Sequence, residues 1–370
     1  MVLLVRAGSA QDPPGKGGLA HLLEHAVFEG SFDLPGAAFI RSARRSGVEF
    51  NAHTAREFTT FEFSAPASSF FEEAGQMLKL VTSPGLDRVN VERVAAVVKT
   101  ENAWRGTPRV SLLDSALFDT QDNVLGTGQS RDRIKADDLV DFYARWYVPS
   151  NITMVVAGPV EVDRVGEWVL KALRLPPSLP EEWVERRAER MTLPVDQRTR
   201  APLGLTIVGY AVEAEDAAMC ESLADVLDRR LAVTRELSDI GASAEVGCTT
   251  LRGNLLLLAE VSAAHVDAST DLSALVERTF ATVQRSPPTA KEMSALVKRH
   301  TLLQDRKAAH PSSLAMELAV LAAQQRSGRS TDLRSLRPPA SMRPPDIRAF
   351  AKRNFQPERR VSIVFTPYEG

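Results

Sequence analysis

The chain contains an internal repeat, which constrains its fold more than any other feature. Residues 138–159 read DLVDFYARWYVPSNITMVVAGP, and residues 346–367 read DIRAFAKRNFQPERRVSIVFTP. The two segments align without a gap at an offset of 208 residues (346 minus 138), and Pro149 falls on Pro357. Each copy predicts a helix that begins at an Asp, ends before a Pro and is followed by a β-branched strand. We therefore expect a duplicated chain with two homologous halves.

The repeat divides the 370 residues into two expected domains, 1–175 and 201–370. Residues 176–200 combine PPSLP with charged stretches and are expected to form a linker, partly helical. Strand-like and helix-like runs mix in each half without regular βαβ spacing. This pattern favours an α+β fold, with helices packed on a largely antiparallel sheet in each half.

Hydrophobic patterning places the elements of each half. In the first half, we expect strands at 2–7 and 58–64 and helices at 19–28, 69–81 and 89–104. In the second half, we expect strands at 203–210 and 254–261 and helices at 217–235, 268–285, 290–309 and 313–325.

The charge balance and the apolar runs exclude two classes of protein. Lys and Arg number 45 against 47 Asp and Glu, which leaves a net charge of -2. A chain with this balance and no long basic run is not a nucleic-acid binder. No apolar run approaches the roughly 18 residues that a membrane-spanning helix needs. The sequence therefore predicts neither a nucleic-acid partner nor a membrane span.

The compartment is left open by the cysteines and by the N-terminus. Cys220 and Cys248 are too few for a disulfide framework and lack metal-ligand spacing, so we expect them to be buried small apolar residues. The opening MVLLVRAGSAQ lacks the regions of a signal peptide and is expected to be a strand that starts abruptly. We expect a cytoplasmic protein if this N-terminus is complete, and a periplasmic location is open if an upstream segment was removed.

The segment GGLAHLLEHAVFEGS, residues 17–31, carries the pattern H-x-x-E-H at His21, Glu24 and His25. On a helix, positions i and i+4 lie on one face, so both imidazoles can reach one metal ion. Glu24 projects beside the pair, where it can act on a metal-bound water. Two histidines leave Zn²⁺ in need of a third protein ligand and an open position. The pattern is the inverted form of the zinc-peptidase helix, whereas the alternative is a pair of surface histidines.

An acidic side chain from a neighbouring helix is the expected third ligand. The segment VERVAAVVKTENAWRG offers Glu92 and Glu101, and 75 residues separate His25 from Glu101. GLAHLLEH followed at this distance by an acidic residue resembles the pitrilysin–insulysin family of inverted zinc metallopeptidases, which includes the two-domain mitochondrial processing peptidases. NAHTAREFTTFEF, residues 51–63, and the segment 142–160 also resemble that family.

The resemblance implies a fold and a set of roles. Two homologous α+β domains would face each other as half of a clamshell, with one zinc ion per chain in the N-terminal domain and peptide held in a chamber. His21, His25 and Glu101 would bind zinc, and Glu24 would be the general base. The family's second acidic residue, seven positions before the third ligand, is here replaced by Val94, and the nearest acid is Glu92. We assign Glu92 a supporting role beside the metal.

Substrate contacts are a further implication of the resemblance. Asn51 and Ala52 would form an edge strand to which an extended peptide adds by main-chain hydrogen bonds. The alternative is a turn before a strand. Phe28 could line a side-chain pocket or belong to the core. Arg235, in the segment LAVTRELSDIGASAEVG, would grip the substrate or be an ordinary surface residue.

The tyrosine that partners this arginine in the family is missing, because residues 238–250 contain no Tyr. The resemblance therefore implies a zinc half without a complete gripping half. We expect a zinc metalloendopeptidase acting on short or unfolded peptides, as a heterodimer with a homologue that lacks H-x-x-E-H or as a homodimer. One rival is a non-catalytic, structural or chaperone-like subunit of a processing-peptidase-like complex. The other is a different metal hydrolase.

Overall fold

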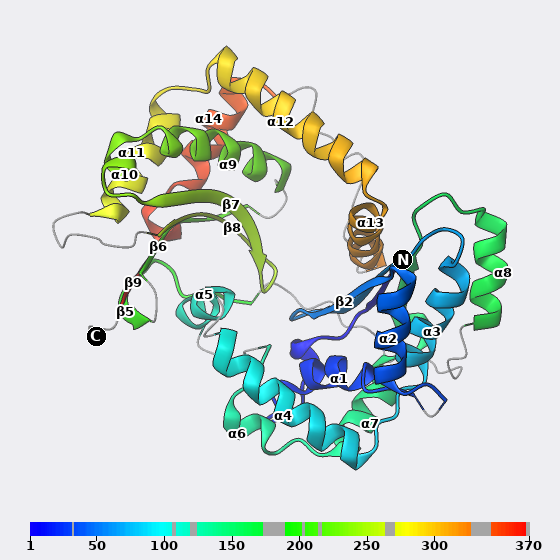
Figure 1. The fold of residues 1–370 in the computed structure, drawn as a ribbon. Helices are drawn as coiled ribbons and strands as arrows, with labels where there is room; N and C mark the ends of the chain where they lie inside the picture. The colour runs from blue at the N-terminus through cyan, green and yellow to red at the C-terminus, as the bar shows by residue number, and fades with distance from the viewer. Residues whose placement is uncertain are drawn as a thin grey trace. The chain divides into compact units, whose positions relative to one another are not determined.

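The computed structural model describes residues 1–31, 33–105, 109–118, 124–172, 189–201, 204–213, 217–262, 271–326 and 342–367 (Figure 1). Contacts between these residues group into two compact units. Each unit is built around one sheet with helices packed on it.

The first unit holds a four-stranded sheet in the order β2-β3-β1-β4, and every described pair in it is antiparallel. Its strands are β1 (Val2–Val5), β2 (Glu49–Thr54), β3 (Thr59–Ser64) and β4 (Ile152–Val155). Its helices are α1 (Leu19–Val27), α2 (Gly36–Ser46), α3 (Phe70–Thr82), α4 (Arg88–Arg105), α6 (Gly128–Arg131), α7 (Ala136–Trp146), α8 (Val162–Ala172) and α13 (Pro311–Arg326).

Strand alternation divides the apolar residues of β1 between two faces of this sheet. Leu3 and Val5 point into a core shared with α1, α3 and α7. Val2 and Leu4 point to the opposite face, where α13 covers them. Alanines at every fourth position of α13 let that helix approach the sheet closely: Ala315, Ala319 and Ala323.

The second unit holds a five-stranded sheet in the order β5-β9-β6-β8-β7. Its strands are β5 (Val195–Ala201), β6 (Leu205–Val212), β7 (Ser243–Leu251), β8 (Asn254–Ser262) and β9 (Arg360–Pro367). Only the β5–β9 pair is parallel among the described strands. Its helices are α5 (Arg109–Leu117), α9 (Ala217–Ala232), α10 (Arg235–Asp239), α11 (Leu272–Arg285), α14 (Pro344–Asn354) and most of α12 (Ala290–Ala309).

Helices cover both faces of the second sheet as well (Figure 1). The helices α9, α11 and α14 pack on one face, and α5 packs on the other. A buried ion pair anchors α5: the Arg252 guanidinium donates to both oxygens of Asp114, with Nε 2.7 Å from Oδ1. Nη1 of the same guanidinium bonds Glu189 at 2.7 Å, and the group lies over the Phe118 ring.

The duplication predicted from the sequence is present in the backbone. The helices α7 and α14 are offset by 208 residues at both ends, as are the 3₁₀ turns Pro149–Asn151 and Pro357–Arg359. The strands β2, β3, β1 and β4 occupy the same order as β7, β8, β6 and β9. The helix α1 corresponds to α9, since each follows the first of these strands along the chain. The expected α+β fold with two homologous halves is therefore confirmed.

The contact units are not two consecutive stretches of chain. The helix α5 belongs to the second sheet, although it lies between segments of the first unit, and α13 belongs to the first sheet from within the second half. Residues 195–200, inside the expected linker, begin strand β5. The remainder of the expected linker lies mostly outside the described residues. The predicted boundaries at 175 and 201 stay a prediction.

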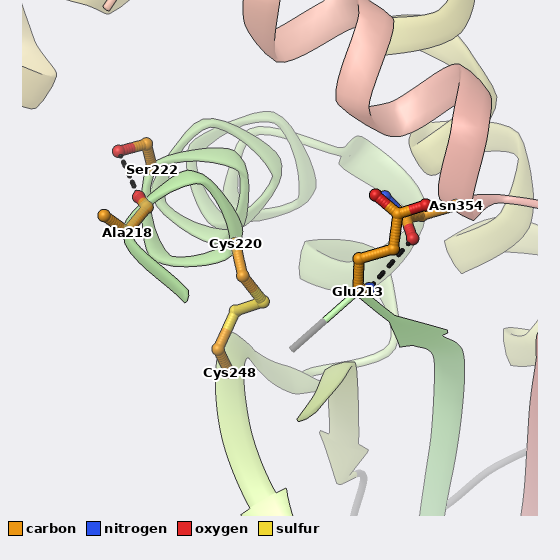
Figure 2. Close-up of a disulfide and its surroundings, with 6 residues drawn as sticks. All are labelled: Glu213, Ala218, Cys220, Ser222, Cys248 and Asn354. Carbon is orange, nitrogen blue, oxygen red and sulfur yellow. Dashed lines mark hydrogen bonds between the residues drawn. A yellow bond between two sulfur atoms is a disulfide. The ribbon is translucent and has the colours of Figure 1, made fainter. Parts of the chain in front are cut away.

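Cys220 is buried as expected, but Cys248 is half-buried, and the expectation that both are simply small apolar residues is wrong. Cys220 on α9 and Cys248 on β7 form a disulfide, with their Cα atoms 6.2 Å apart (Figure 2). The two residues are 28 positions apart, so their spacing gave no sign of the pairing. They meet because α9 packs directly on β7 in the core of the second unit. Disulfides of this kind persist mainly in oxidising compartments.

Within the described residues, every helix is too short or too polar to cross a lipid bilayer.

Candidate metal centre

The helix α1 presents the three residues of the H-x-x-E-H pattern, and its entry is tightly constrained. Gly18 precedes the helix with φ of 95°, and a Cβ there would lie 2.8 Å from the Leu125 carbonyl oxygen. The left-handed conformation and the close approach both require glycine. The carboxylate of Asp12 accepts from the amides of Gly18 at 2.7 Å and Ala20 at 2.9 Å. A carboxylate at this end of a helix satisfies free amides and complements the helix dipole.

The two histidines converge as a zinc site requires. His21 Nε2 and His25 Nε2 are 3.3 Å apart, and the rings stand nearly perpendicular. Two nitrogens bound at about 2.1 Å to a tetrahedral zinc ion would be about 3.4 Å apart. One ligand atom from each of His21, Glu24 and His25 lies within 4.8 Å of the others. The described residues therefore fit a zinc ion, with two imidazoles as ligands and a carboxylate beside them.

Glu24 is buried and held by a hydroxyl from the sheet. Its exposed fraction is 8%, and Thr54 Oγ1, at the end of β2, donates to Glu24 Oε2 at 2.5 Å. Tyr147 is fully buried nearby, and burial together with the Glu24 charge raises the pKa of its hydroxyl well above the usual range. The carboxylate of Glu24 is thus held by the Thr54 hydroxyl on the side of the sheet.

The third expected ligand, Glu101, lies on α4, but its side chain is outside the described residues. Its position falls on the same face of α4 as Val94 and Val98, which are buried in the core that α1 shares. Glu92 lies on a different face, is exposed and accepts from Arg88 Nε at 2.8 Å. The roles assigned to Glu101 and Glu92 stay predictions.

Three of the expected substrate residues, Asn51, Ala52 and Phe28, lie on or beside an edge of the first sheet, and the fourth lies in the second unit. In the described sheet, β2 pairs with β3 alone, so the other side of β2 is an edge. Asn51 is exposed, Ala52 is half-buried, and the strand replaces the turn of the alternative interpretation. Phe28 is half-buried at the end of α1, with its ring 5.5 Å from that of Phe50. Arg235 is exposed at the first residue of α10 in the second unit.

Sequence reasoning missed Thr54 and Asp12. Thr54 ends the strand segment, and it shares the inward-facing alternation with Phe50 and Ala52. That alternation was a usable signal for a side chain directed at α1. Asp12 offered no comparable signal. It lies in a loop of Pro and Gly, where no local pattern predicts that its carboxylate accepts hydrogen bonds from the amides at the start of α1.

A duplicated α+β chain with H-x-x-E-H on the first helix defines the class of the inverted zinc-peptidase fold. Family models agree with this architecture: residues 1–119 match Insulinase (Peptidase family M16), and residues 133–299 match the Peptidase M16 inactive domain. The chain belongs to peptidase family M16, the insulinase family.

The curated relatives include peptidases and a non-peptidase. The probable zinc protease PqqL of Haemophilus influenzae is 27% identical over 179 residues, which are 44% of this chain and 19% of that protein. The non-peptidase homolog YmxG of Helicobacter pylori is 25% identical over 185 residues, which are 47% of this chain and 42% of that protein. The matches thus span less than half the length of these relatives.

Solved structures share the fold along the whole chain. A protease from Helicobacter pylori superposes with a TM-score of 0.80 at 17% identity, covering 99% of this chain and 93% of that one. The periplasmic protease PqqL from Escherichia coli superposes with a TM-score of 0.71 at 16% identity, covering 99% of this chain and 44% of that one.

Proposed function

We propose that the chain is a zinc-dependent endopeptidase that hydrolyses short or unfolded peptides, with His21, His25 and Glu101 as zinc ligands. The observation that carries the proposal is the 3.3 Å separation of the two imidazole nitrogens beside a buried carboxylate. The helical register of Glu101 with Val94 and Val98 supports it over the exposed, Arg88-paired Glu92 as third ligand. Glu92 keeps the proposed supporting role beside the metal, from an exposed position on α4.

In this proposal, the chain's own residues transfer the proton and bind the peptide. Zinc in such a site activates water at neutral pH and polarises a carbonyl oxygen. Glu24 takes a proton from water at its carboxylate and delivers it to the leaving amine nitrogen. An extended peptide adds to the edge of β2 at Asn51 and Ala52 by main-chain hydrogen bonds. Phe28 is proposed to contact a substrate side chain beside this strand, and Arg235 is proposed as a substrate contact of the second half.

Metal analysis with ligand variants tests the proposal. The purified protein should hold about one zinc per chain and hydrolyse an unfolded peptide, and a chelator should abolish both. His21→Ala, His25→Ala and Glu101→Gln should each release the zinc, because each removes one of three protein ligands. Glu92→Gln is the matched control on the same helix and should retain it. If Glu101→Gln retained zinc and Glu92→Gln lost it, Glu92 and not Glu101 would be the third zinc ligand.

The second candidate function is that of a non-catalytic subunit, and two observations favour considering it. YmxG is described as a non-peptidase homolog, and residues 238–250 of this chain lack a tyrosine to accompany Arg235. The missing tyrosine also supports a heterodimer. In it, this chain binds the zinc, and a homologue without H-x-x-E-H binds the substrate. A homodimer is the alternative assembly. The zinc and hydrolysis measurements separate the subunit function from the peptidase function.

One purification tests both the assembly and the compartment. The Cys220–Cys248 disulfide supports an oxidising compartment, such as the periplasm of the Escherichia coli relative. Tagged protein, isolated from separate cytosolic and extracytoplasmic fractions with thiols blocked, should come from the latter with both cysteines unlabelled. Mass spectrometry should identify a co-purifying homologue, and adding that homologue should raise hydrolysis. Labelled cysteines would contradict the compartment, and activity unchanged by the homologue would contradict the proposed heterodimer.

A further inference from the structure

The end of strand β2 contacts the carboxylate that the proposed function makes the general base. Thr54 is the most buried residue of that strand, with an exposed fraction of 3%. Its hydroxyl lies 2.5 Å from Glu24 Oε2, and an ionised carboxylate can only accept, so the hydroxyl donates. Hydrogen bonds to a carboxylate are about twice as strong as those between neutral groups. The bond therefore holds one oxygen of Glu24 and restricts the orientations that the carboxyl group can take.

The hydroxyl of Thr54 is itself held in place relative to α1. The turn after Thr54 is bonded to the segment that leads into the helix, because the Ser9 amide donates to the Ala55 carbonyl at 3.1 Å. Thr59, the cross-strand neighbour of Thr54, donates its hydroxyl to the Ala7 carbonyl at 2.9 Å. A β-branched side chain also has little freedom about χ1. The donor is thus a rigid part of the sheet.

We propose that Thr54 is a positioning residue that fixes the Glu24 carboxylate for proton transfer, an inference that rests on the proposed peptidase function. A general base must lie within hydrogen-bond reach, about 2.6–3.2 Å, of the heavy atom whose proton it takes. A misplacement of about 1 Å can lower the rate about 10²-fold. Because Thr54 holds Oε2, it confines the orientations in which the carboxylate can meet the water and the leaving nitrogen.

The test compares three substitutions of buried threonines. Thr54→Val removes only the hydroxyl and should lower kcat about 10- to 100-fold, as loss of a supporting contact does. KM, zinc content and the Kd for zinc should not change, because the ligands are untouched. Thr54→Ser restores a hydroxyl and should retain most of the activity. Thr60→Val, in the same hairpin, is the control: the hydroxyl of Thr60 bonds the His53 carbonyl, and kcat should stay at the parent value.

A double variant separates positioning from a general loss of structure. In a Glu24→Gln background, Thr54→Val should cause no further loss of kcat, since a positioning residue acts only through the group that it holds. A further loss there, or a parental kcat for Thr54→Val, overturns the role of Thr54 while the peptidase function stands. A parent protein that binds no zinc and hydrolyses no peptide contradicts the proposed function itself, and the role of Thr54 with it.

Discussion

Replacing Glu24 by glutamine is expected to lower the kcat of peptide hydrolysis by about 10²- to 10⁴-fold, because an amide cannot take up the proton that a general base must accept. The substitution preserves the size of the side chain, and its carbonyl oxygen can still accept from Thr54. Zinc content and thermal unfolding should therefore match the parent protein. Steady-state kinetics on an unfolded peptide, with metal analysis of the same sample, measure the effect.

The control for this experiment is Glu57→Gln, an exposed carboxylate in the turn between β2 and β3. It changes the net charge by the same amount and should leave kcat unaltered. Parental activity in Glu24→Gln, with zinc bound, would contradict the assignment of the general base. Loss of zinc in the same variant would instead show that Glu24 supports the metal directly.

Replacing Arg252 by methionine is expected to destabilise the second unit by about 3–5 kcal/mol, because it leaves the buried Asp114 carboxylate without its cation. The Arg252 side chain is 1% exposed and that of Asp114 is 9% exposed, so water cannot take the place of the guanidinium. A loss of this size should lower the melting temperature of the second unit by roughly 6–20 °C. Scanning calorimetry, which resolves separate transitions, measures the shift.

Two further variants show whether the loss comes from the unpaired charge. Adding Asp114→Asn to Arg252→Met should recover part of the stability, since a neutral amide is easier to bury than a carboxylate. Arg343→Met removes an ion pair with Asp346 that is exposed, and it should leave unfolding unchanged. An Arg252→Met protein that melts with the parent would mean that the ion pair adds nothing to the attachment of α5.

The repeating pattern of apolar residues was enough to predict those helices and strands that bury one continuous apolar face. The helix expected at 290–309 is α12 with the same ends, and those at 69–81 and 313–325 correspond to α3 and α13 within two residues. The helices α2 and α8 were not predicted. Each has eleven residues and several charges, three in α2 and four in α8, so its apolar positions form only a short stripe.

Pairings between distant segments were the part that sequence could not supply. Strand β7 was not predicted because it alternates small and polar residues at an edge, where burial is weak. The Cys220–Cys248 bond depends on α9 packing on that strand, which no spacing rule expresses. In the site, His21 and His25 were readable because helix geometry alone brings them together. The alternation of β2 indicated only that Thr54 faces inward; its bond to Glu24 was not readable, because the two residues are 30 positions apart on different elements.

The helix α13, which covers the second face of the first sheet, is synthesised long after the strand that it covers. Val2 and Leu4 leave the ribosome long before α13, which begins only at residue 311. At 5–20 residues per second, this delay is about 15–60 s. The nascent first unit therefore exposes an apolar sheet face to the cytosol or to a translocation channel while most of the second unit is synthesised. A chaperone that shields this face during translation, or export in an unfolded state, would protect the growing chain from aggregation.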